Sequence, residues 1–113
     1  MPERDLVYLK QIMDCIFDLE LFVKDCNENS FIADKKTQSA AIRMLELIGE
    51  VTKRLSDELK HNNQNIAWKK IAGLRDVLIH NYEGVDISAV WQIIQINIPE
   101  LKKQIQSLIQ KYN

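Results

Sequence analysis

The sequence predicts an all-α protein, an up-and-down bundle of four to five helices that forms a single domain over residues 1–113. The chain contains three Gly and two Pro, too few turn-forming residues for a barrel or sandwich of many short strands. Apolar residues instead recur at intervals of three and four positions, which is typical of amphipathic helices. With 46% hydrophobic residues, a chain of this length can bury one modest core.

The first helix is expected over residues 3–26. Pro2 precedes it, where a missing N–H costs nothing, and Glu3 and Asp5 favour the positive end of the helix dipole. Polar residues 27–30 end it. Its apolar face consists of Leu6, Leu9, Ile12, Met13, Ile16, Leu19, Phe22, Val23 and Cys26.

The second helix is expected to begin between Ser30 and Asp34 and to continue to Leu59 or Lys60. Gly49 lies in its middle, where glycine costs about 1 kcal/mol relative to alanine. We therefore expect close helix packing or a dimer contact at this position. Residues 60–65 are polar and are predicted to form a loop. The apolar stripe consists of Ala41, Ile42, Met44, Leu45, Ile48, Val51, Leu55 and Leu59.

Two further helices complete the bundle. The third is expected from Ile66 to Ile79 or His80, and Gly84 closes the turn that follows. Asp86 is the predicted N-cap of the last helix. Pro99 lies inside that helix, removes one backbone hydrogen bond and crowds the carbonyl of residue 95, so the helix is expected to kink or break over residues 95–98.

The charge balance excludes some functions. Fifteen basic and sixteen acidic side chains give a formal charge of -1, which excludes a protein-wide basic field for nucleic acid and an acidic solvating tail. Residues 1–57 carry eight basic and eleven acidic side chains, whereas residues 58–113 carry seven and five. An anion-binding surface is therefore expected in the second half.

The cysteine pattern indicates a reducing compartment. Cys15 and Cys26 are eleven positions apart, about 16 Å along one helix, whereas a disulfide needs Cα atoms within about 7 Å. With no recognisable secretory leader, the unpaired thiols predict a cytoplasmic protein. No apolar run approaches the roughly 18 residues of a membrane span. No zinc-type spacing or Gly-rich phosphate loop is present, so we expect no metal or cofactor.

One cluster, Arg75, His80 and Tyr82, is not explained by helix packing. An arginine fork suits phosphate, a histidine can both accept and donate a proton near pH 7, and a tyrosine hydroxyl can donate, accept or be modified. Residues five apart on a helix differ in direction by about 140°, so Arg75 and His80 of one chain do not share a face. Either the helix ends by His80, or two chains contribute to one site. A helix-terminal histidine acting as a cap, and an arginine paired with a neighbouring carboxylate, are the structural alternatives.

The spacing Arg75-x4-His80-x-Tyr82 matches the signature of the HEPN superfamily. The context is similar to the HepT branch of that superfamily from about residue 6 to residue 105. The matching segments are Ala41-x-Arg43-x-Leu45-Glu46-x-Ile48-Gly49-Glu50, Leu55-Ser56, Ile66-x-Trp68-x-x-Ile71-x-Gly73-x-Arg75 and Val90-Trp91.

The resemblance implies a metal-independent endoribonuclease whose active site forms where two copies of the motif meet in a homodimer. The ribose 2′-hydroxyl would attack the adjacent phosphorus, leaving a 2′,3′-cyclic phosphate and a 5′-hydroxyl. His80 would be the general acid or base, and Arg75 would stabilise the charge on the phosphate. Asp76 would orient either residue.

The resemblance also implies regulation. HepT-like proteins are toxins of type VII toxin–antitoxin systems, in which a minimal nucleotidyltransferase antitoxin transfers AMP to the motif tyrosine, here Tyr82. A phosphodiester and a base would then occupy the place of the substrate phosphate. The alternative function is a non-catalytic HEPN domain that binds nucleotide or docks a nucleotidyltransferase. A purely structural dimerisation bundle is a third alternative.

The remaining charged and aromatic residues outside the motif are interpreted mainly as structural. Glu46 and Glu50 have the spacing for a divalent metal but no neighbouring histidine, so we expect them to pair with Arg43, Lys53 or Arg54. Trp68 and Trp91 lie on apolar stripes and are expected to anchor the core or an interface. His61 is expected to be solvated. Lys69 and Lys70 are expected on a solvated face, with contact to the RNA backbone as the functional alternative.

Overall fold

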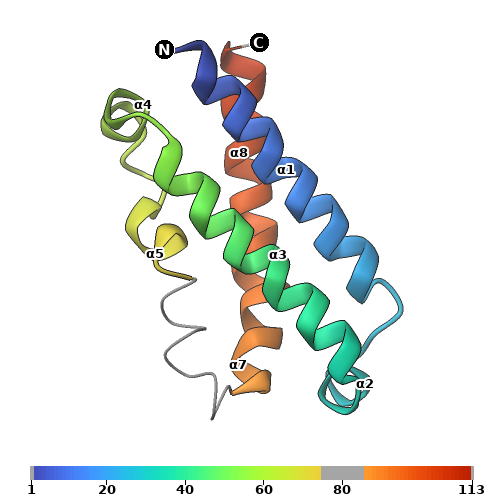
Figure 1. Cartoon of the computed structure of the whole chain (residues 1–113). Coiled ribbons are helices and arrows are strands. Elements are labelled where there is room, and N and C mark those ends of the chain that lie inside the picture. The colour runs from blue at the N-terminus through green and yellow to red at the C-terminus, as the bar shows by residue number, and fades with distance from the viewer. Residues whose placement is uncertain (1, 75–85, 113) are drawn as a thin grey trace.

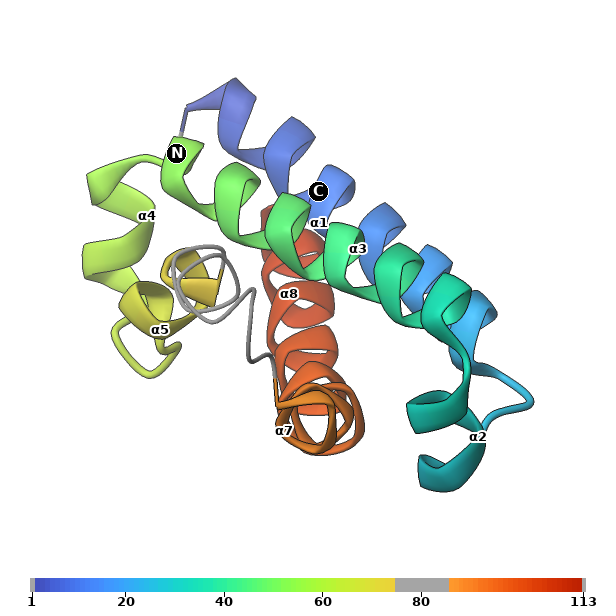
Figure 2. The ribbon, with the colours of Figure 1, turned by 60° about the horizontal axis from the view of Figure 1, so that its bottom comes forward.

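A computed structural model describes residues 2–74 and 86–112, and every regular element in those two ranges is helical. The two long antiparallel helices α1 (Glu3–Val23) and α3 (Lys35–Arg54) lie side by side, and their mutual contact is the most extensive in the fold (Figure 1). Helix α8 (Ile98–Tyr112) packs against α1 and runs at a steep angle to the pair (Figure 2). The predicted all-α class is confirmed.

Helix α1 buries a narrower face than predicted. Its buried apolar residues are Leu9, Ile12, Met13, Ile16, Leu19 and Val23. Phe22, expected in the core, points about 110° from the centre of this stripe and is 39% exposed. The helix ends at Val23, so Cys26 lies beyond it. The buried face of α1 therefore follows strict i, i+3, i+4 spacing.

The second helix begins at Lys35, one residue after the predicted window of Ser30 to Asp34, and is preceded by a short additional helix. Asn27 caps α2 (Glu28–Ala33) through a capping box with Ser30. Asp34 then caps α3, accepting a hydrogen bond from the Thr37 backbone N–H at 3.2 Å and another from the Thr37 hydroxyl at 2.6 Å. The polar run that follows α1 therefore starts α2, and a separate polar cap starts α3.

The prediction that the second helix continues to Leu59 or Lys60 is wrong. Leu55 and Ser56 have extended backbones, and α4 (Asp57–Asn62) begins after them. The Ser56 hydroxyl accepts a hydrogen bond from the Leu59 N–H at 3.1 Å and so caps α4. Part of the predicted 60–65 loop is consequently the last turn of this helix.

The last helix departs from α geometry near Pro99, as predicted, but widens instead of breaking. Asp86 caps α7 (Ile87–Gln92), as the sequence predicts. A π-helical turn, η2 (Ile93–Asn97), joins α7 to α8, and the N–H of Ile98 donates to the carbonyl of Ile93, five residues earlier. This wide turn accommodates the missing N–H of Pro99.

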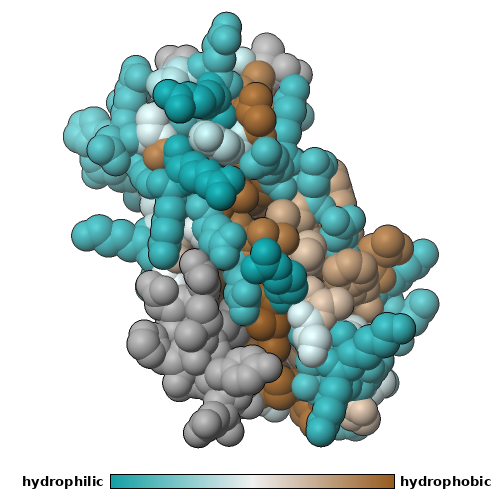
Figure 3. Space-filling view, in the orientation of Figure 1, coloured by the Kyte–Doolittle hydropathy of each residue, from teal (hydrophilic) through white to brown (hydrophobic). Residues whose placement is uncertain are grey.

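Several large apolar side chains lie on the surface. Phe17 and Leu21 of α1 are 49% and 67% exposed, and Figure 3 shows hydrophobic surface over the C-terminal half of α1, on the right of the view. Lys102 of α8 contacts this region through an ion pair and a cation–π interaction. Its ammonium lies 3.0 Å from a Glu20 carboxylate oxygen and 5.3 Å from the centre of the Phe17 ring. Within the described ranges, no helix has the length and apolar composition needed to cross a bilayer.

Candidate functional site

The predicted catalytic and modified residues, Arg75, Asp76, His80 and Tyr82, lie outside the described residues, as does Gly84. The structure describes what flanks them in the sequence. Helix α5 (Trp68–Ala72) and Leu74 precede the motif, and Asp86 and α7 follow it. Helix α5 packs against α3. Of the described elements, α5 and α7 are therefore the ones that adjoin the motif in the sequence.

Helix α5 is held in place by Trp68. The Trp68 side chain is buried, and its indole N–H donates to the backbone carbonyl of Asn63 at 3.0 Å. This confirms Trp68 as a core anchor. The helix starts at Trp68, two residues later than the predicted Ile66.

Lys69 and Lys70 are both exposed on α5, which agrees with a solvated face. Gly73 follows as the C-cap, and its N–H donates to the carbonyl of Lys69 at 2.9 Å. A Cβ on Gly73 would lie 3.1 Å from that same carbonyl oxygen. Glycine therefore allows the last turn of α5 to close tightly just before Arg75.

A pocket of about 230 Å³ lies between α5 and the η2–α8 junction. Its apolar lining includes Ile71 and Leu74, and its polar lining includes Asn97, Glu100 and Gln104. Leu74 is bonded directly to Arg75 in the chain. The cavity therefore lies beside the described end of the segment that carries the motif.

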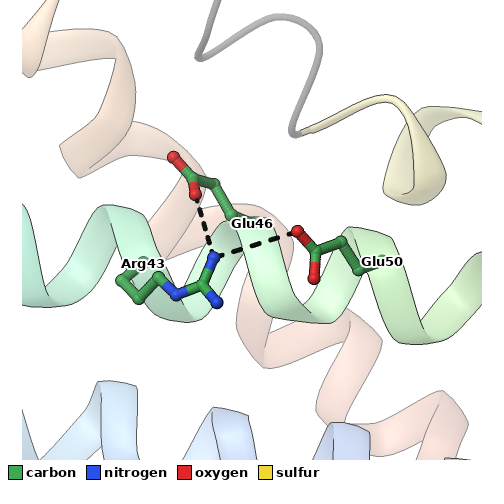
Figure 4. Close-up of polar contacts among 3 residues, drawn as sticks. All are labelled: Arg43, Glu46 and Glu50. Atoms are coloured by element: carbon green, nitrogen blue, oxygen red, sulfur yellow. Dashed lines mark hydrogen bonds and ion pairs between the residues drawn. The ribbon is translucent and has the colours of Figure 1, made fainter.

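On α3, Arg43 links the two carboxylates singled out in the sequence. Its Nη1 lies 3.3 Å from an oxygen of Glu46 and 3.8 Å from an oxygen of Glu50, as Figure 4 shows. The pairing expected along this helix is confirmed. No group of three or more His, Cys, Asp or Glu side chains suited to a metal occurs among the residues that the structure describes.

Trp91 and His61 also match their structural interpretations. Trp91 is buried against Phe31, with ring centres 5.1 Å apart. His61 is exposed, and its Nδ1 lies 3.2 Å from the side-chain nitrogen of Gln64. It belongs to α4 and not to a loop. Neither residue has a geometry that suggests chemistry.

The two cysteines are free thiols, as the sequence predicted. Burial raises the pKa of the Cys15 thiol above its usual value, and the carboxylates of Asp18 and Asp14 raise it further, while Arg43 acts in the opposite direction. A thiol with a raised pKa is a poor nucleophile near neutral pH. Cys15 is therefore not a candidate catalytic residue.

Sequence reasoning missed two features. Asp5 is 1% exposed, and its carboxylate binds Ser56 of a distant segment. The acidic pair Asp57 and Glu58 directly after Ser56 was an available signal for a helix start there. No local sequence pattern predicts the pocket beside α5, because the residues that line it come from two segments far apart in the chain.

Comparison with known proteins identifies the family. The model of the family described as "HepT-like: Ribonuclease HepT-like" matches residues 12–108. The chain is 39% identical to "Putative RNase MJ0125" of Methanocaldococcus jannaschii, over 96% of this chain and 95% of that protein. It is 40% identical to "Probable ribonuclease HepT" of Thermococcus cleftensis, over 89% of this chain and 92% of that protein.

A third relative is "Putative RNase TTE0752" of Caldanaerobacter subterraneus, 41% identical over 92% of this chain and 93% of that protein. No solved structure matches the chain significantly. The family model spans most of the described core, from the buried Ile12 of α1 to the buried Leu108 of α8. The chain therefore belongs to the HepT-like ribonuclease family.

Proposed function

We propose that this protein is the toxin of a type VII toxin–antitoxin system, a metal-independent endoribonuclease that acts on RNA in the cytoplasm. The observation that carries the proposal is the sequence Arg75-x4-His80-x-Tyr82 in a chain of the HepT-like family. Arginine and histidine together supply what RNA cleavage requires, which is a fixed positive charge for phosphate and a group that titrates near pH 7.

In this mechanism His80 takes the proton from the ribose 2′-hydroxyl or gives one to the departing 5′-oxygen. The 2′-oxygen forms a bond to phosphorus as the bond to the 5′-oxygen breaks, leaving a 2′,3′-cyclic phosphate and a 5′-hydroxyl. Arg75 stabilises the extra negative charge in the transition state, and Asp76 orients one of these two groups. General acid–base catalysis of this kind contributes about 10²- to 10⁴-fold.

The active species in this proposal is a homodimer. Arg75 and His80 are five positions apart, so a single continuous helix would direct them about 140° apart. Two copies of the motif at a subunit interface would let one chain's arginine serve the other chain's histidine. The exposed Lys69 and Lys70 would add phosphate contacts along the incoming RNA strand.

Regulation in this proposal acts through Tyr82. A minimal nucleotidyltransferase antitoxin would transfer AMP from ATP, with the tyrosine oxygen attacking the α-phosphorus and pyrophosphate leaving. The product carries a negative phosphodiester and an adenine where the substrate would lie. Both the charge and the bulk oppose RNA binding.

The test compares two histidine variants, since the chain has only His61 and His80. Purified wild-type protein should cleave single-stranded RNA in the presence of a chelator, leave DNA of the same sequence intact, and produce cyclic-phosphate ends detectable by mass spectrometry. His80→Ala should lose this activity. His61→Ala, in an exposed position on α4, should retain it.

Expression in cells that lack the antitoxin provides the second readout. The wild type and His61→Ala should arrest growth, and His80→Ala should not. RNA or nucleotide binding that weakens in His80→Ala without cleavage at any protein concentration would contradict the nuclease and favour the non-catalytic HEPN domain. Equal behaviour of all three proteins in every assay would contradict both.

A further inference from the structure

We infer that the pocket between α5 and the η2–α8 junction binds a nucleobase through its Watson–Crick edge, and so sets base preference beside the cleaved phosphodiester. This inference rests on the proposed function for its role in cleavage, but not for the binding itself. The pocket volume of about 230 Å³ is below the roughly 300–1,000 Å³ typical of sites for drug-sized ligands. It suits a single ring system.

The polar wall of the pocket comes from one face of the last helix. Asn97, Glu100 and Gln104 are spaced by three and four positions, so their side chains project on the same side. Two side-chain amides and one carboxylate provide both donors and acceptors. That mixture matches the edge of a base, which also alternates donors and acceptors.

In residues 2–74 and 86–112, neither Asn97 nor Gln104 uses its side chain in a hydrogen bond within the protein. Apolar side chains from both sides line the same cavity, namely Ile71 and Leu74 from one side and Ile93, Ile98 and Leu101 from the last helix. An apolar surface with a few convergent polar groups is the usual composition of a small-ligand site.

The carboxylate of Glu100 selects the kind of ligand. It would repel a phosphate in the pocket, whereas it can accept a hydrogen bond from the exocyclic amino group of cytosine, adenine or guanine. Uracil offers the carboxylate only its N3–H, which lies between two carbonyl oxygens that a carboxylate repels. Lys70, also at the pocket, can contact the adjoining phosphate. The arrangement therefore favours amino-bearing bases over uracil.

The position of the pocket supports a role in RNA cleavage. Leu74 forms part of its wall and is bonded to Arg75, so a base in the pocket would lie near the segment that carries the motif. The π-helical turn supplies Ile93 and Asn97 to the same pocket, and single π-turns occur frequently at functional sites. Sequence-specific proteins commonly read RNA by holding an unstacked base in this way.

The test is an NMR titration of ¹⁵N-labelled protein with CMP, AMP, GMP and UMP. At least one of the amino-bearing nucleotides should shift the side-chain amide signals of Asn97 and Gln104 saturably, and should bind about tenfold more tightly than UMP. Glu100→Gln should reduce this discrimination. Gln104→Leu should weaken binding at least fivefold. Gln106→Leu, the same change on another face of α8, should bind like the wild type.

Titration results of two kinds would overturn the inference. One is the absence of saturable shifts at these two amides with any of the four nucleotides. The other is equal binding of all four by the wild type. Because the titration requires no catalysis, a protein that binds nucleotides in this pocket but never cleaves RNA would refute the nuclease proposal and leave the pocket assignment intact.

Cleavage of a randomised RNA pool identifies the source of the base. If the wild type avoids cutting beside uracil and Gln104→Leu loses this preference, the base held in the pocket comes from the RNA substrate. An unchanged cleavage pattern in this variant, together with lost binding of AMP, would overturn the RNA role and assign the pocket to the adenine of an adenylyl group. An unchanged pattern with unchanged nucleotide binding would overturn the inference entirely.

Discussion

The carboxylate of Asp5 accepts two hydrogen bonds from Ser56, one from its backbone N–H at 2.8 Å and one from its hydroxyl at 2.5 Å. The two residues are 51 positions apart. This contact fixes the start of α1 to the junction between α3 and α4. The same hydroxyl accepts the Leu59 N–H at 3.1 Å, so one buried carboxylate orients a helix cap.

Ser56→Ala should lower the free energy of unfolding by about 1–3 kcal/mol, because Asp5 loses a donor and α4 loses its cap. Asp5→Ala should be similarly destabilising, since two donors lose their acceptor. Urea denaturation measures both, and the double variant should cost less than the sum because the residues share one network. Asp57→Asn, at an exposed position nearby, is the control. A change below 0.5 kcal/mol for Ser56→Ala, the range typical of surface substitutions, would contradict the role of this contact.

Adenylylation should be confined to one of the three tyrosines. With ATP and a minimal nucleotidyltransferase, the wild type should gain adenylyl mass and lose ribonuclease activity. Tyr82→Phe should gain none and stay active. Tyr112→Phe, which removes a partly buried tyrosine at the end of α8, should behave like the wild type. Intact-protein mass spectrometry gives the readout, and mass gain in Tyr82→Phe would refute the assignment.

The Arg43 ion pairs on α3 should contribute little to stability. Arg43 has a side chain that is 55% exposed, and exposed helix pairs are worth about 0.2–0.5 kcal/mol. Arg43→Met should therefore shift the urea midpoint only slightly, and the difference from wild type should vanish in high salt because salt screens exposed charges. A large loss that persists in 1 M salt would indicate a different role for Arg43.

The Cys15 thiol should react slowly in the folded protein. Because burial raises its pKa, alkylation by iodoacetamide at pH 8 should be slower than in urea-unfolded protein, and the ratio should narrow as the pH rises. The thiol holds its proton more tightly in the folded state than in the unfolded state. Its contribution to the free energy of unfolding is therefore complete below the pKa of the unfolded state and is lost as the pH rises through the pKa of the folded state. Peptide mass spectrometry measures the rate, and equal rates in both states would contradict the prediction.

Local signals in the sequence predicted much of the fold. Asp86 caps its helix because an aspartate can bond the N–H three residues later without help from elsewhere, and Pro99 disturbs its helix through its own missing N–H. The apolar residues of the first helix predict a broad buried face that includes Phe22, whereas the bundle buries a narrower face and leaves Phe22 exposed. The break at Ser56 was missed because the carboxylate that favours it belongs to α1.

The candidate site likewise contains residues that the sequence predicts and a pocket that it does not. Arg75, His80 and Tyr82 could be selected from their spacing alone, since that spacing is a property of a short segment. The pocket could not, because Leu74 and Gln104 come together only when α5 packs near α8. Whether two chains complete the catalytic centre also depends on contacts between subunits, which the order of residues in one chain does not specify.

The π-helical turn has a consequence for changes in chain length. A turn closed by a bond across five residues contains one residue more than an α-helical turn. Deleting Gln95 would convert it to an ordinary turn and leave the buried faces before and after it aligned, whereas a deletion within α8 would rotate all later residues by about 100°. Homologous chains that differ by one residue in this helix should therefore carry the gap between residues 93 and 97.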